Sequence, residues 1–145
     1  MKIEIIFTFF ILFNSCNYAL LSPSTDECTY VSSNMFQTLK PLPQTKMPVT
    51  RWTVNGQYPA PIIQANFGDR LLINVTNKFG DPATVHWHGL FQNGTNFYDG
   101  PVGVTQCPIP NGVSFLYNFT LNQYGTYWYH SHITGQIIDG LKGPL

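Results

Sequence analysis

Charged residues are scarce in this chain of 145 residues: seven lysines and arginines balance seven aspartates and glutamates, together 10% of the sequence. No basic stripe is available to neutralise phosphates, which argues against nucleic acid as a partner. Alanine occurs only four times, whereas aromatic residues make up 15% and are joined by 12 glycines and 11 prolines. This composition disfavours a helical fold and favours strands connected by turns.

Long apolar runs are also missing, except near the amino terminus. Residues 5–13 form an apolar stretch behind Lys2, but a membrane span needs about 20 such residues. Ala19 follows as the small residue of a cleavage site. We therefore predict a signal peptide over residues 1–19, loss of Cys16 with it, and a secreted protein without a membrane anchor. The alternative, a buried strand or helix, is disfavoured by the terminal position and the lack of polar alternation.

Cysteine is sparse as well, and secretion changes how it is interpreted. Cys28 and Cys107 remain after the leader, in a compartment where disulfides persist. They could bridge each other, or Cys107 could reach a partner outside this chain. Three sequons begin at Asn74, Asn93 and Asn118. In a eukaryotic host each is a potential acceptor of N-linked sugar.

The remaining sequence predicts an N-terminal arm over residues 20–48 and one domain over residues 49–145. Ser22–Pro48 is rich in Ser, Thr, Gln and Pro, which is typical of an irregular arm or an edge segment. Beyond it, short β-rich runs alternate with turn signals, and we predict strands over 49–54, 62–67, 70–76, 84–88, 114–121 and 126–130. The pattern indicates an all-β fold, a sandwich or a barrel. Because the sequence stops after a turn that would lead into another Greek-key strand, we expect the domain to be incomplete.

All four histidines fall into two copies of one pattern, His86-Trp87-His88 and His130-Ser131-His132. In a strand, side chains at positions i and i+2 point to the same face. If the two strands are neighbours, four imidazoles converge on one patch. Imidazole is a good ligand for copper, zinc, iron and nickel, and copper binds tightest in the affinity series. We therefore predict a metal site rather than ordinary surface or core histidines.

The residue types also limit the kind of metal site. A blue-copper centre needs one cysteine and two histidines, usually with an axial methionine. Cys107 has no neighbouring histidine, and the methionines, at positions 1, 35 and 47, all precede the cluster. A blue-copper site built from this chain alone is therefore disfavoured. A closed four-histidine zinc site remains open, although it would leave no position for chemistry.

Two longer motifs resemble a known family. Residues 84–95, Thr-Val-His-Trp-His-Gly-Leu-Phe-Gln-Asn-Gly-Thr, resemble the first copper motif of the multicopper oxidases. Residues 125–132, Gly-Thr-Tyr-Trp-Tyr-His-Ser-His, are similar to the second. The resemblance runs from about Arg51 to the end of the chain. The motifs are most similar to those of fungal laccases and fungal iron-oxidising relatives. It implies the amino-terminal, plastocyanin-like domain of a secreted oxidase, with a cupredoxin-like Greek-key β-sandwich.

The resemblance also implies a cofactor and roles for individual residues. In this family a trinuclear copper cluster reduces oxygen to water with electrons taken from a small reducing substrate. By position, His86 would bind the type-2 copper. His88 and His130 would share one type-3 copper, and His132 would bind the other. Asp99 falls where the family keeps an acid that assists proton delivery, although a turn aspartate before glycine is a common structural role.

Two motifs of the complete family are absent from the 145 residues. Neither His-x-x-His-x-His nor His-Cys-His occurs, so half of the trinuclear ligands and the electron-entry site would come from further cupredoxin domains. Cys107 matches a cysteine that typically bridges to that region. We expect the isolated chain to be inactive, whether it is a fragment of an oxidase or a non-catalytic copper-binding domain. The electron donor stays open among phenols, aromatic amines and ferrous iron.

Overall fold

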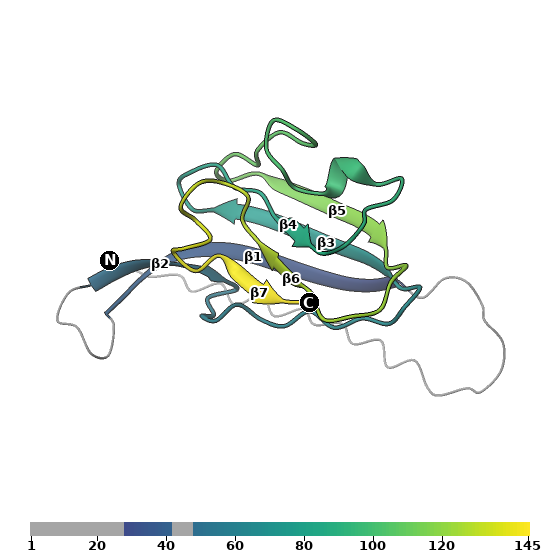
Figure 1. The fold of residues 1–145 in the computed structure, drawn as a ribbon. Coiled ribbons are helices and arrows are strands. Elements are labelled where there is room, and N and C mark those ends of the chain that lie inside the picture. The colour runs from purple at the N-terminus through teal and green to yellow at the C-terminus, as the bar shows by residue number, and fades with distance from the viewer. Residues whose placement is uncertain (1–27, 42–47) are drawn as a thin grey trace.

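The computed structural model describes residues 28–41 and 48–145, and the predicted signal peptide lies outside them. Seven strands and one short 3-10 helix make up the described part (Figure 1). Their bounds are β1 Cys28–Pro41, β2 Pro48–Val54, β3 Arg70–Lys78, β4 His86–His88, η1 Asn96–Tyr98, β5 Ser114–Thr120, β6 Trp128–His130 and β7 Lys142–Pro144. Among these residues no helix is both long and apolar enough to cross a membrane.

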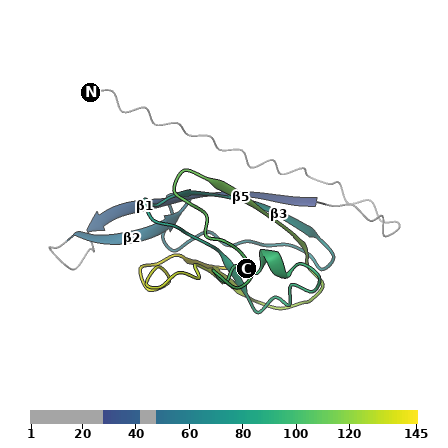
Figure 2. The same ribbon diagram turned by 90° about the horizontal axis from the view of Figure 1, so that it is seen from above.

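The strands form two sheets. The larger has the order β2-β1-β3-β5 and the smaller the order β4-β6-β7. The β1 and β3 strands are parallel, whereas the other neighbours are antiparallel. Figure 2 shows the larger sheet as one layer, with the carboxy-terminal segment below it. The fold is therefore an all-β, cupredoxin-like sandwich, as the sequence predicts.

The core lies between the sheets and follows from the alternation of side chains. Every second residue of β3, starting at Leu71, is buried. In the ladder with β5, Leu71 is opposite Phe119 and Ile73 is opposite Tyr117, and both partners are buried as well. From the smaller sheet, Trp87 is only 1% exposed and meets Tyr117 edge to face, with ring centroids 5.1 Å apart. Because Trp87 points inward, its two histidine neighbours on β4 point outward.

The predictions for four segments need correction. Residues 28–41, expected to be an irregular arm or an edge segment, form β1, which lies between β2 and β3. It pairs with the following strand β2 and with the more distant β3, so pairing outweighs the turn-rich composition. Residues 62–67 form no strand. The strands predicted over 84–88 and 126–130 are limited to the short β4 and β6, where a ladder partner is present.

Tyr117 anchors the segment that leads into β4. Its hydroxyl accepts a hydrogen bond from the backbone N–H of Val85, with 3.0 Å between the atoms. Burial raises the pKa of Tyr117 to about 12, although bonds to Val85 and Gln106 oppose the shift. The hydroxyl is therefore neutral throughout the physiological range.

We expect Tyr117→Phe to lower the free energy of unfolding by about 1–3 kcal/mol, because the buried N–H of Val85 loses its acceptor. Urea denaturation measures the change. Tyr124→Phe is the matched control, since Tyr124 is 79% exposed and should change stability by less than about 0.5 kcal/mol. Equal stability of both variants would show that the Val85 bond is dispensable.

Gly100 packs directly against the backbone before β4. Its φ is +104°, and an added Cβ would overlap the carbonyl oxygen of Val85 and lie 2.7 Å from the Cα of His86. Gly100→Ala should therefore destabilise the protein more than Gly103→Ala. Gly103 also has a positive φ, +74°, but open space around it, so its variant should lose only about 1–2 kcal/mol from backbone strain. Urea denaturation of both decides, and equal losses would contradict the close packing.

Candidate metal centre

The two His-x-His pairs come from neighbouring strands of the smaller sheet. The β4 and β6 strands are antiparallel, with His86 opposite His130 and His88 opposite Trp128. Trp87 and Tyr129 point into the core, at 1% and 3% exposure. Alternation therefore places the histidines of both strands on the outer face of this sheet.

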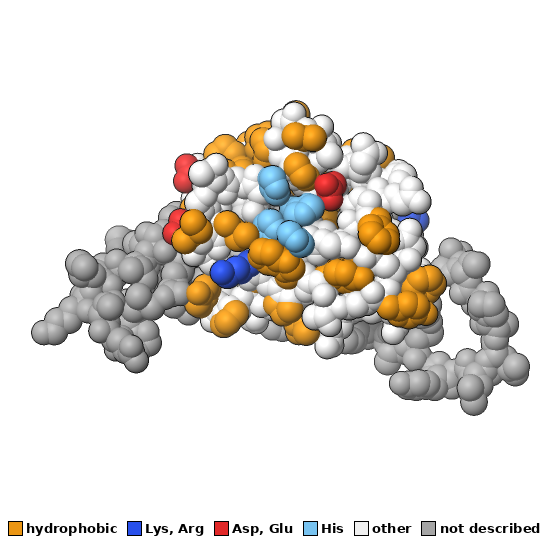
Figure 3. Space-filling model, viewed as in Figure 1, with side chains coloured by type: hydrophobic (Ala, Val, Ile, Leu, Met, Phe, Trp, Pro, Cys, Tyr) orange, Lys and Arg blue, Asp and Glu red, His pale blue; other side chains and the backbone are white. Residues whose placement is uncertain are grey.

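The four predicted ligands gather in one patch. The ring centroid of His86 lies 5.5 Å from that of His88, 5.3 Å from His130 and 5.4 Å from His132. The rings of His130 and His132 are stacked with centroids 6.2 Å apart. The patch opens on the molecular surface, where the pale-blue imidazoles are contiguous in Figure 3. The predicted convergence of the four imidazoles is therefore present.

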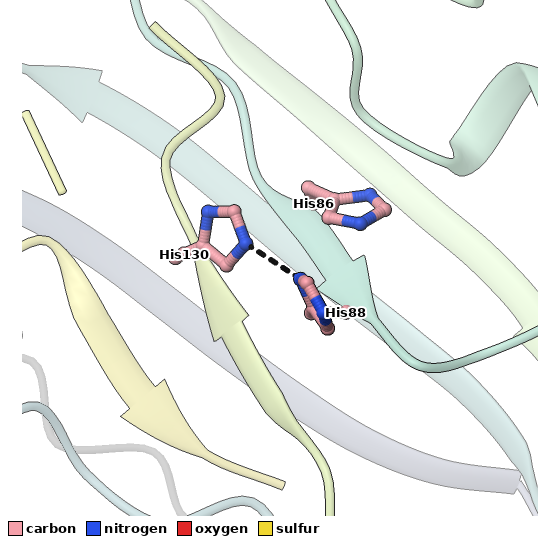
Figure 4. A group of neighbouring side chains, drawn as sticks. All are labelled: His86, His88 and His130. Carbon is pink, nitrogen blue, oxygen red and sulfur yellow. Dashed lines mark hydrogen bonds between the residues drawn. The ribbon is translucent and has the colours of Figure 1, made fainter. Parts of the chain in front are cut away.

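Three of the imidazoles are close enough to share one ion. One nitrogen from each of His86, His88 and His130 lies within 4.8 Å of the others. The Nδ1 atom of His88 and the Nε2 atom of His130 face each other at 3.2 Å (Figure 4). Two nitrogens on one tetrahedral ion, each about 2.0–2.1 Å from it, lie roughly 3.3 Å apart. The spacing therefore fits two ligands of one metal.

Backbone carbonyls set which ring nitrogens remain available. The Nδ1 of His86 bonds the carbonyl oxygen of Asp99 at 2.7 Å, and the Nδ1 of His130 bonds that of Ser131 at 2.8 Å. A carbonyl only accepts, so each Nδ1 carries the proton and each Nε2 keeps its lone pair. Both Nε2 atoms are thus ready to bind a cation. Imidazole nitrogens are donors that copper accepts readily, so the residues fit that metal.

The protonation of His130 favours metal binding too. Burial lowers its pKa, and the neighbouring His86, His88 and His132 lower it further, although the hydrogen bond to Ser131 opposes them. A lowered pKa keeps the ring neutral at physiological pH. Only the neutral form offers a lone pair to a metal.

Asp99 lies beside the patch. It follows η1, and its Oδ1 is 3.3 Å from the Nδ1 of His86. The shorter bond to that nitrogen comes from the backbone oxygen of Asp99 itself. The carboxylate is therefore fixed near the histidines while 26% of its side chain stays exposed.

Trp128 is a neighbour of the imidazoles that the two His-x-His pairs do not include. Its ring centroid lies 4.2 Å from that of His130 and 4.9 Å from that of His88. The two-residue period of a strand could have predicted this position, because residues 128, 130 and 132 are each two positions apart.

Two further features border the histidines. His132 lines an open hollow of about 720 Å³, together with Trp52, Pro108 and Asp139 among others. Cys107 is exposed and has a free thiol, whereas the side chain of Cys28, its other possible partner, lies outside the described part of the chain. The bridge to a partner outside the chain stays a prediction.

Known proteins similar to this chain are copper enzymes, in agreement with the histidine patch. A family model described as multicopper oxidase covers residues 36–145. The iron transport multicopper oxidase fetC of Epichloe festucae is 60% identical over 93 residues, and Laccase-1 of Cryptococcus neoformans is 52% identical over 95. These matches cover 63% and 65% of this chain but only 15% of each relative.

A solved structure agrees with this comparison. Fet3p, described as a multicopper oxidase that functions in iron import, superimposes with a TM-score of 0.73 at 42% identity. The match covers 81% of this chain and 22% of Fet3p. The family model, the shared fold and the group of histidines lead to the same conclusion. This chain belongs to the multicopper oxidase family, whose metal is copper.

Proposed function

We propose that the chain supplies four histidine ligands to a trinuclear copper cluster of a secreted oxidase. Copper held by these ligands would supply the redox chemistry by which oxygen is reduced to water and a phenolic, aromatic amine or ferrous donor is oxidised. The facing nitrogens of His88 and His130, 3.2 Å apart, carry the proposal. Two lone pairs at that distance repel each other unless a proton or a cation lies between them.

The nitrogen positions support a division of the ligands. His86 offers Nε2, because its Nδ1 is held by Asp99, and we assign it to the type-2 copper. His88 through Nδ1 and His130 through Nε2, which face each other at 3.2 Å, would hold one type-3 copper together. His132, which lies beyond them on the same face, binds the other.

The rest of the coordination comes from elsewhere in the oxidase. The chain spans 15% of the length of its matched relatives, and His88 and His132 are exposed in it. A further cupredoxin domain seated over the patch and the adjoining hollow would add the missing ligands. Bound copper supplies one-electron redox chemistry, while this chain holds the ligands and excludes water from the inner side of the sheet.

Asp99 is the proposed proton donor. Its backbone oxygen orients His86, and its carboxylate lies 3.3 Å from the same ring. The side chain thus has one end at the ligands and 26% of its surface in solvent. A carboxyl group in that position can take protons from water and release them at the site where oxygen is reduced.

The donor belongs to one of the classes represented by the relatives. One matched relative is an iron transport oxidase and another is a laccase. A second candidate function is a non-catalytic secreted copper-binding domain. It is favoured by the fact that the four imidazoles gather within this chain alone.

Copper titration of the purified chain tests the ligand assignment. His88→Ala and His130→Ala should each weaken copper binding by more than about tenfold. Loss of a residue that only hydrogen-bonds to a metal ligand already lowers metal affinity by about 10–100-fold. Thr134→Ala, an exposed position close to His132 in sequence, should bind like the native chain. Unchanged affinity in both histidine variants would overturn the assignment.

Oxygen consumption separates the two candidate functions. The copper-loaded chain should consume no oxygen with a phenol or ferrous iron, because the remaining ligands and the electron-entry site are not among its residues. The full-length oxidase should consume oxygen, and Asp99→Ala in it should slow the reaction. Turnover by the 145 residues alone would contradict this proposal.

Trp128 should report on copper binding. Its ring lies against two ligand imidazoles, and bound Cu²⁺ quenches a nearby indole. Fluorescence should therefore fall on titration with Cu²⁺, and Trp128→Phe should remove most of the fall. Thr134→Ala is the control, because it keeps all three tryptophans and should be quenched like the native chain. An undiminished fall in Trp128→Phe would place the copper elsewhere.

A further inference from the structure

A buried serine lies between the two histidines of the second pair. Ser131 is only 2% exposed. Its Oγ donates a hydrogen bond to Oε1 of Gln136, with 2.6 Å between the atoms, and accepts one from the backbone N–H of Ile133 at 3.2 Å. The hydroxyl therefore has a donor and an acceptor inside the protein, and the chain between His130 and His132 is held from the inner side.

Gln136 connects this serine to the segment that leads into the other histidine pair. It is 5% exposed, and its Nε2 donates a hydrogen bond to the carbonyl oxygen of Pro82 at 2.8 Å. Pro82 lies four residues before His86, the first residue of β4. The amide fits in one orientation only, because the reverse would place Oε1 against the Pro82 carbonyl, and two acceptors form no hydrogen bond. One side chain thus joins the residue after β6 to the segment before β4.

The backbone of the same serine orients a metal ligand. The carbonyl oxygen of Ser131 accepts the hydrogen bond from Nδ1 of His130 at 2.8 Å. The N–H of Ser131 donates to the carbonyl of Leu141, and the N–H of Leu141 donates to the carbonyl of Gln136, both at 3.0 Å. A shift of Ser131 would therefore move the carbonyl that leaves Nε2 of His130 free for a metal.

We propose that Gln136 is a positioning residue of the metal site. Through Ser131 it keeps the proton of His130 on Nδ1, and through Pro82 it holds the two histidine pairs in place relative to each other. The side chain of Gln136 binds no metal itself. Its effect on copper rests on the proposed function, whereas its effect on the ring of His130 needs no metal.

Nitrogen NMR of the imidazoles in the copper-free chain tests the positioning, at a pH where the rings are neutral. The native chain should show the proton of His130 on Nδ1, because that atom donates to a carbonyl. Gln136→Met keeps the length of the side chain but removes both hydrogen bonds, so His130 should become a mixture of the two neutral tautomers. Ser131→Ala breaks the same chain of bonds at its other end and should do the same. It decides the question if Gln136→Met does not fold.

A merely structural role predicts a different result. Gln136→Met would then lower the urea midpoint while His130 kept the tautomer of the native chain, and that outcome would overturn the proposal. Gln92→Met is the matched control. Gln92 is also a buried glutamine, 8% exposed, whose Oε1 accepts a hydrogen bond from the hydroxyl of Thr95 at 2.8 Å. Because Thr95 belongs to neither histidine pair, the signals of His130 should not change, and an equal change would contradict the assignment.

Copper titration separates this role from the ligand assignment. Gln136→Met and Ser131→Ala should each weaken copper binding by about 10–100-fold. The double variant should lose little more than the larger single loss, because both changes break one chain of hydrogen bonds. Native affinity in Gln136→Met, with binding still weakened in His88→Ala and His130→Ala, would reject the positioning role alone. Native affinity in the histidine variants, with an altered tautomer in Gln136→Met, would reject the ligand assignment and support the positioning role.

Discussion

The burial of Trp87 between the two sheets is the contact on which the metal site depends. Its ring fills the space between β4 and the larger sheet, against Tyr117 and Phe119. A strand has only two faces, so an inward Trp87 forces His86 and His88 outward together. Tyr129 plays the same part on β6, at 3% exposure. The ligand face is thus determined from inside the protein by apolar burial, the largest favourable term in folding.

Backbone groups complete what burial begins. The carbonyls of Asp99 and Ser131 each hold one ring nitrogen, which fixes both the tautomer and the ring plane. Neither interaction needs a particular side chain, but both need a defined path of the chain. The close approach of Gly100 to Val85 shows how narrow that path is. A ligand held by backbone and core is organised before the metal arrives, and this lowers the ordering cost of binding.

Most of the metal site could be predicted from short sequence patterns. The two-residue period of a strand is a property of adjacent residues, so the shared face of His86 and His88 could be predicted without a structure. The same period would have included Trp128, had it been applied to aromatic residues. Asp99 was found only through resemblance, because its approach to His86 depends on how a loop and η1 return to β4.

The pairing of strands could not be predicted from local sequence patterns. The β1 strand is central to its sheet although its composition indicates an arm, since hydrogen bonds to β2 and β3 decide its state. The opposite error concerns residues 62–67, which have β-forming side chains but no ladder. There Ile62 is 60% exposed, and Phe67 stacks on Tyr124 with centroids 4.6 Å apart. The strand propensity of a residue measures how well its side chain fits a pleated surface. It does not show whether a neighbouring strand is available for pairing.

The order of strands along the chain has a consequence for synthesis. The larger sheet uses residues up to Thr120, whereas β6 and β7 of the histidine sheet come later. Domains generally fold as units, and the larger sheet buries its inner face against Trp87 of the smaller one. Copper delivered to a growing chain would therefore find a single pair of imidazoles, because His130 and His132 are synthesised after His86 and His88.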